Sequence, residues 1–76
     1  MTSDIQSVLI HKHPNNNVTI SKSLAQYYIK LHNFKPIKKV HETKNYFRFR
    51  IREPNEFKSF IIKPINDTMS FVIGFY

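Results

Sequence analysis

The chain has 76 residues, with 12 lysines and arginines, 5 acidic residues and no cysteine. This length allows one small hydrophobic core, so we expect a single domain, residues 1–76. The lack of cysteine excludes disulfides, thiolate nucleophiles and cysteine-based zinc sites. The formal net charge of +7 favours nucleic acid or another acidic surface as the partner.

The first predicted element is a short strand from Ile5 to Ile10. Alternation puts Ile5 and Leu9 on one face and Val8 and Ile10 on the other. Because the segment is apolar on both sides, we expect it inside a sheet. A Pro-Asn-rich loop, residues 14–17, ends it, since proline lacks the N–H that a strand needs and asparagine tolerates turn conformations.

A helix is predicted next, from the N-cap Ser21 to about His32. Ile20 precedes the cap as a possible hydrophobic staple. Asn33 is the expected left-handed closing residue, and Phe34 can fold back on the last turn.

This helix has two apolar stripes. One consists of Ala25, Tyr28, Ile29 and His32. The other consists of Leu24, Tyr27 and Leu31. A single sheet cannot cover both, so we predict a homodimer whose interface contains the second stripe. The alternative is that residues 14–20 of the same chain cover it.

Beyond the helix the pattern changes to period two. Residues 37–43 and 46–53 are expected to form a hairpin around Lys44-Asn45, and residues 60–63 and 69–75 a second one around Asn66-Asp67. Pro64 favours an edge position for its strand. The predicted fold class is α+β, in the order β-α-β-β-β-β, with one helix packed on a mostly antiparallel sheet of four to five strands.

The segment Tyr46–Arg52 contains every arginine of the chain. On a strand, Phe47, Phe49 and Ile51 would line the core, because alternate side chains share a face. The opposite face would carry Tyr46, Arg48, Arg50 and Arg52. Guanidinium groups bind phosphate bidentately and a tyrosine ring can stack on a base, so this face predicts a nucleic-acid site that Lys38 and Lys44 would enlarge.

A half-exposed strand also alternates charged and apolar residues without any ligand. In that interpretation the arginines pair with nearby acids and keep the sheet in solution. The candidate partners are Glu42, Glu53 and Glu56.

Catalytic and metal-binding patterns are weak. His11 and His13 would share a strand face, with His32 or His41 as a third nitrogen, but no acidic residue flanks the pair to support zinc. Glu42-Thr43-Lys44 is similar to part of a metal-dependent nuclease centre, although a suitable upstream aspartate is missing. We therefore expect no enzyme activity, metal, cofactor or small-molecule substrate.

Three segments resemble a group of short proteins of unknown function encoded by bacteriophages and giant DNA viruses. They are Tyr28–Pro36, Glu42–Arg50 and Phe71–Gly74, and the resemblance covers most of the chain from Ser21 onward. It implies a viral origin and an α+β fold, and it implies no activity.

The resulting functional hypothesis is a small basic, virus-encoded protein that binds nucleic acid through the arginine-rich strand and self-associates through the helix. The alternative is a viral adaptor that binds a host or viral protein through an acidic patch or by sheet-edge pairing. With no apolar run long enough to span a bilayer and no signal-peptide pattern at Met1–Asp4, we expect an intracellular location without membrane contact. For a viral protein this would be the host cytoplasm or nucleus.

Overall fold

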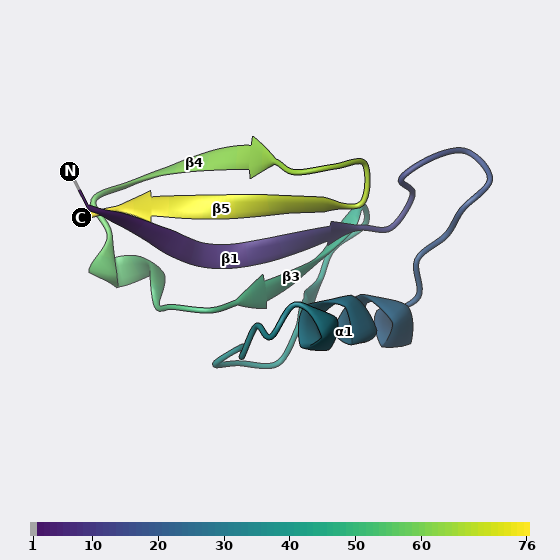
Figure 1. Ribbon diagram of the computed structural model, residues 1–76, viewed down its shortest axis with the longest axis horizontal. Helices are drawn as coiled ribbons and strands as arrows, with labels where there is room; N and C mark the ends of the chain where they lie inside the picture. Colours follow the sequence, from purple (N-terminus) through teal and green to yellow (C-terminus); the bar gives the residue numbers. More distant parts are fainter. Residues whose placement is uncertain (1) are drawn as a thin grey trace.

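The computed structural model describes residues 2–76 as one helix packed on a five-stranded sheet (Figure 1). The strands are β1 (Ser3–His11), β2 (His41–Glu42), β3 (Tyr46–Arg50), β4 (Ser59–Pro64) and β5 (Met69–Phe75). The helix is α1 (Lys22–Leu31), and a short 3₁₀ helix, η1 (Pro54–Glu56), connects β3 to β4. The strand order is β2-β3-β1-β5-β4 and every neighbouring pair is antiparallel, which confirms the predicted α+β fold.

The central strand is β1, as its two apolar faces predicted. A bulge at Gln6 interrupts it, where the Gln6 carbonyl accepts from both Ile51 N (2.8 Å) and Arg52 N (3.1 Å). A bulge inserts one extra residue into a strand, so side chains before and after it no longer alternate in the same phase. Ile5 therefore packs against the main core together with Val8, and the prediction that Ile5 shares a face with Leu9 is wrong.

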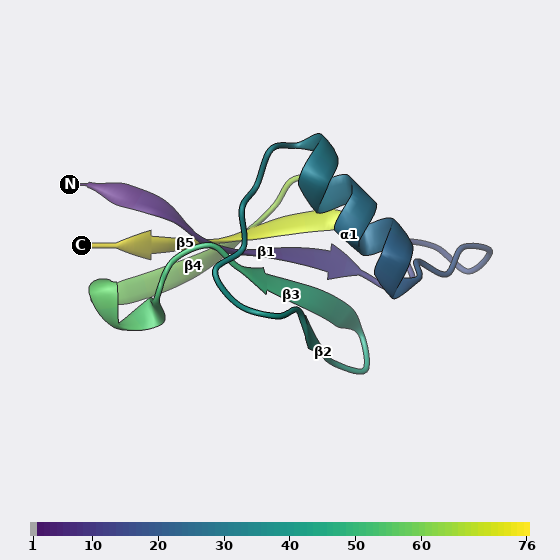
Figure 2. The ribbon, with the colours of Figure 1, turned by 90° about the horizontal axis from the view of Figure 1, so that it is seen from below.

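Helix α1 begins and ends as the sequence predicted. The Ser21 hydroxyl accepts from Leu24 N (3.2 Å), which satisfies a free N–H of the first turn. Asn33 is left-handed with φ 61°, and Phe34 N returns to the Ile29 carbonyl (3.1 Å). Figure 2 shows the helix lying across one side of the sheet. No helix within residues 2–76 is long and apolar enough to cross a membrane.

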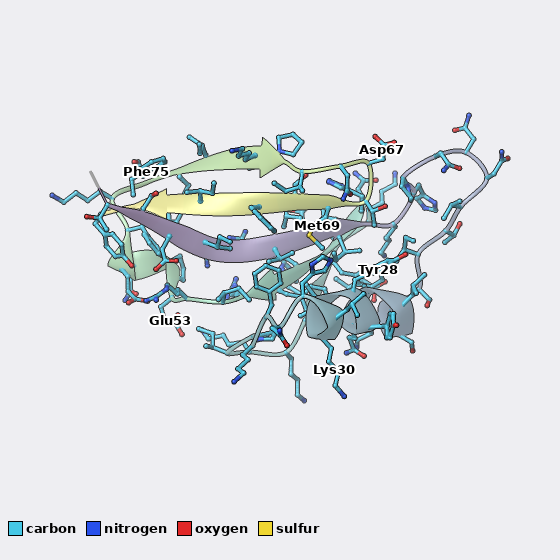
Figure 3. All side chains as sticks on the ribbon, in the orientation of Figure 1. Tyr28, Lys30, Glu53, Asp67, Met69 and Phe75 are labelled. Atoms are coloured by element: carbon cyan, nitrogen blue, oxygen red, sulfur yellow. The ribbon has the colours of Figure 1, made fainter. Side chains whose placement is uncertain are left out.

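We call the side of the sheet under α1 the covered face and the other side the open face. The main core lies on the covered face and consists of Val8, Ile10, Ile20, Ala25, Ile29, Phe47, Phe49 and Met69. Tyr28 of the helix and Met69 of β5, both labelled in Figure 3, belong to this layer. Phe47 and Phe49 are buried, while Tyr46, Arg48 and Arg50, which alternate with them, are only partly buried, so the predicted alternation of β3 is confirmed.

The first hairpin is shorter than predicted. Of residues 37–43 only His41–Glu42 pair as a strand, and β3 ends at Arg50 rather than near residue 53. Val40 packs against the main core, and of its upstream neighbours only Ile37 still donates its N–H to β3, at the Arg50 carbonyl (2.9 Å). Burying Val40 thus competes with edge pairing. The second hairpin forms as predicted, with Pro64 on an edge strand.

Candidate nucleic-acid interface

The open face changes character from one edge of the sheet to the other. The register aligns Arg48 with Leu9 of β1, Ser70 of β5 and Pro64 of β4. The next row runs Arg50, Ser7, Val72 and Ile62. Cationic side chains from β3 therefore stand at one side of this face and apolar side chains from β4 at the other. Leu9 and Val72, between them, are buried although no helix of the described residues covers them.

Arg48 is held by neutral partners. Its Nη2 donates to Gln6 Oε1 (2.8 Å) and its Nε to Ser7 Oγ (3.1 Å). Gln6 and Ser7 are completely buried, Ser7 Oγ donates to Gln6 Oε1 (2.6 Å), and Gln6 Nε2 donates to the Arg52 carbonyl (2.8 Å). This network orients the guanidinium group without neutralising it, because an amide and a hydroxyl carry no charge.

The other two arginines differ from Arg48 and from each other. Arg50 Nε is buried and finds no hydrogen-bond partner within residues 2–76, which is costly for a donor. Arg52 Nε lies 3.1 Å from Asp4 Oδ2 in an exposed ion pair. Among the described residues, Arg48 and Arg50 are thus the two arginines without a carboxylate partner.

The three glutamates proposed as partners of the arginines are occupied elsewhere. Glu42 pairs with Lys12 (2.7 Å) and Glu53 with Lys38 (3.3 Å), while Glu56 Oε2 accepts from the Glu53 backbone N–H at η1. The local pairing expected as the alternative to a ligand site is therefore absent within residues 2–76, apart from Arg52 with Asp4.

The Lys12–Glu42 pair lies on the covered side, where Lys12 Nζ sits 5.0 Å from the centroid of the Phe47 ring. The hydrogen bond from Lys12, and then its charge, lower the pKa of Glu42 below its ordinary value. A carboxylate with a depressed pKa adds stability above its unfolded pKa, and this contribution is lost as pH falls through the folded value.

The remaining predicted site residues are only partly brought together. Tyr46 lies on the open face opposite His11, one row from Arg48, and is half-buried. Lys44 is exposed in the adjacent turn, which Thr43 N closes on the Tyr46 carbonyl (2.9 Å). Lys38 does not join them. It pairs with Glu53 and lines a pocket of about 340 Å³ beside Ile29 on the covered side.

An aromatic cluster on the open face was not predicted from the sequence. The Phe57 ring lies 4.8 Å from that of Tyr76 and 5.8 Å from that of Phe60, measured between centroids. Phe57 occupies the space above Gly74, where any Cβ would approach its ring to 2.3 Å. Phe60 and Tyr76 remain substantially exposed. The signal available in sequence was that Gly74 and Tyr76 share the alternation phase of the open face.

Within residues 2–76 the histidines do not form a metal-binding group. His11 Nε2 lies 2.9 Å from Ser70 Oγ, and His13 is exposed with its Nδ1 3.4 Å from Thr19 Oγ1. Within the part of the chain that the structure describes, no three His, Asp or Glu side chains come close enough to hold a metal ion.

The second stripe of α1 is exposed. Leu24, Tyr27 and Leu31 are 36%, 57% and 60% accessible, so residues 14–20 do not cover them. The predicted dimer contact at these positions stays a prediction.

We found no match to this chain among protein-family models, curated proteins or solved structures. The resemblance to short viral proteins therefore stays a prediction, and function has to be inferred from the geometry of the open face.

Proposed function

We propose that this protein binds single-stranded nucleic acid on the open face of its sheet. The observation that carries the proposal is the pair Arg48 and Arg50, which stand two residues apart on one face without a carboxylate partner within residues 2–76. Like charges on neighbouring positions repel, and an anionic ligand would relieve that repulsion. Guanidinium groups pair readily with phosphate oxygens, so a phosphate backbone is an anion suited to this pair.

The apolar half of the open face favours a single strand over a duplex. Phosphates would follow β3, and bases would extend across the sheet toward Ile62 and the partly exposed rings of Phe60 and Tyr76. Bases stack on aromatic side chains when they are unpaired, whereas a duplex presents mainly its backbone.

The test is fluorescence anisotropy with a labelled mixed-sequence oligonucleotide at low salt. Replacing Arg48 and Arg50 together with Gln should weaken binding at least about tenfold, because both phosphate contacts are lost. The matched control replaces Lys22 and Lys30 with Gln on α1, which removes the same charge on the other side of the sheet. The Lys30 side chain points away from the sheet (Figure 3). This control should bind nearly as well as the parent.

Arg50→Gln alone is a second variant in case the double variant misfolds, since Arg50 Nε has no hydrogen-bond partner within residues 2–76 that the fold would lose. An equal loss of affinity in both double variants would show that binding depends on net charge and not on the position of the arginines. Equal affinity for single strand and duplex would contradict the role of the apolar half. Binding of poly-glutamate with the affinity of the oligonucleotide would instead favour an adaptor that recognises an acidic protein patch.

A further inference from the structure

Within residues 2–76 the outer edge of β4 is unpaired, and it is the more apolar of the two edges of the sheet. All six residues of β4 are exposed, and Phe60, Ile61 and Ile62 are 43%, 50% and 64% accessible. Strand β4 lies at the end of the strand order, and β5 is its one neighbour among the described strands. Such an edge usually carries charged side chains that prevent further pairing. Here Lys63 is the one charged residue of the strand.

The backbone groups available on this edge follow from the register. Ile65 N–H donates to the Met69 carbonyl (3.0 Å), so Ile61 and Lys63, which share its phase, direct their backbone groups toward β5. Phe60 and Ile62 then direct their N–H and C=O outward. Pro64 has the same phase and no N–H, which limits the ladder on that side.

We propose that β4 pairs antiparallel with β4 of a second copy of this chain, on a two-fold axis at Ile61. In this register Phe60 of each copy is opposite Ile62 of the other, so every outward N–H of the two residues has an acceptor. Ile61 faces its own copy across the axis, and Ser59 is opposite Lys63.

The strand is self-complementary only around this centre. Its side chains read polar, apolar, apolar, apolar, polar from Ser59 to Lys63. An axis at Ile62 would place Phe60 opposite Pro64, which has no N–H to donate. An axis at Phe60 would require the N–H of Lys58, which already donates to the Phe75 carbonyl (2.8 Å). The pairing of an aromatic with a β-branched side chain across two strands is also favourable.

The pairing would join two sheets into one and keep both open faces on the same side, because the axis is perpendicular to the sheet. The apolar halves would meet at the centre, with one row of arginines at each end. The contact is small, so we expect association in the high micromolar range. Added salt should strengthen it by screening the +7 charge on each copy.

Cysteine cross-linking tests the proposal directly, because the chain has no cysteine of its own. Ile61→Cys puts two thiols on the axis, at roughly the 4.5 Å Cα separation of a non-hydrogen-bonded pair, which suits a disulfide. We expect a covalent dimer on mild oxidation. Ser59→Cys is the matched control, since its two copies would lie several residues apart across the axis. Tyr27→Cys reports on the exposed helix stripe.

Analytical ultracentrifugation adds a reversible measurement. The parent should shift with concentration from 9.1 kDa toward twice that mass. Ile61→Lys should remain monomeric, because two charges would meet on the axis, while Ile65→Lys, beyond Pro64, should behave as the parent. Cross-linking at Tyr27→Cys without cross-linking at Ile61→Cys would overturn the proposal. A parent protein that stays monomeric at high concentration and high salt would also overturn the proposal. The same holds if β4 binds a peptide of another protein but not a second copy of this chain.

Discussion

The two outer parts of the open face, formed by β3 and β4, differ in their side chains and in how their outer edges are covered. On β3, the charged side chain of Arg48 is fixed by the buried groups of Gln6 and Ser7, and the outer edge is partly closed by β2 and Ile37. On β4, the side chains are exposed and mostly apolar, and within residues 2–76 the outer edge has no partner strand. A strand whose charged side chain is fixed by residues of the neighbouring strand is suited to reversible binding of a ligand. An apolar strand with free backbone groups is suited to another strand.

The largest effect should come from the buried side of β3. Phe49→Ala removes a side chain from the main core, and we expect a loss of about 3–5 kcal/mol in the free energy of unfolding. Ile62→Ala on β4 is the matched change at an exposed position and should cost less than about 0.5 kcal/mol. Urea unfolding of both variants at low protein concentration, where they are monomeric, measures the difference. Similar losses would show that the two strands are not buried as differently as described.

The next effect concerns the anchor of Arg48. Gln6→Ala removes the buried hydrogen-bond partner of Arg48 Nη2 and of the Arg52 carbonyl. We therefore expect a loss of about 1–3 kcal/mol in the free energy of unfolding. Gln26→Ala, on the exposed side of α1, should be close to neutral. A Gln6→Ala variant as stable as the parent would mean that the network does not hold the arginine, and the contrast between β3 and β4 would lose its basis.

Much of this molecule could be predicted from local patterns. The cap at Ser21, the left-handed Asn33, both hairpin turns and the alternation of β3 all depend on neighbours in sequence. What could not be predicted depends on distant contacts. The bulge at Gln6 reverses the face of Ile5, and Val40 leaves the β3 edge for the core.

The candidate site shows the same division. Alternation alone placed Tyr46, Arg48 and Arg50 on one face, whereas Arg52 lies beyond the end of β3. The partners of these residues come from Gln6, Ser7 and Asp4, more than forty positions away, and no local pattern joins them. The structure does not place Lys38 beside the arginines, because the segment expected as a strand at residues 37–43 turns toward the covered side.

The salt dependence of oligonucleotide binding tests the central claim most directly, because it reports the number of phosphates that the protein neutralises. For a single strand, the logarithm of the binding constant falls with the logarithm of salt concentration by about 0.7 per phosphate contacted. Replacing Arg48 and Arg50 with Gln should reduce this slope by roughly 1.4, while the Lys22 and Lys30 replacements should leave it nearly unchanged. A slope that both double variants reduce equally, or that neither changes, would contradict binding through the arginines of β3.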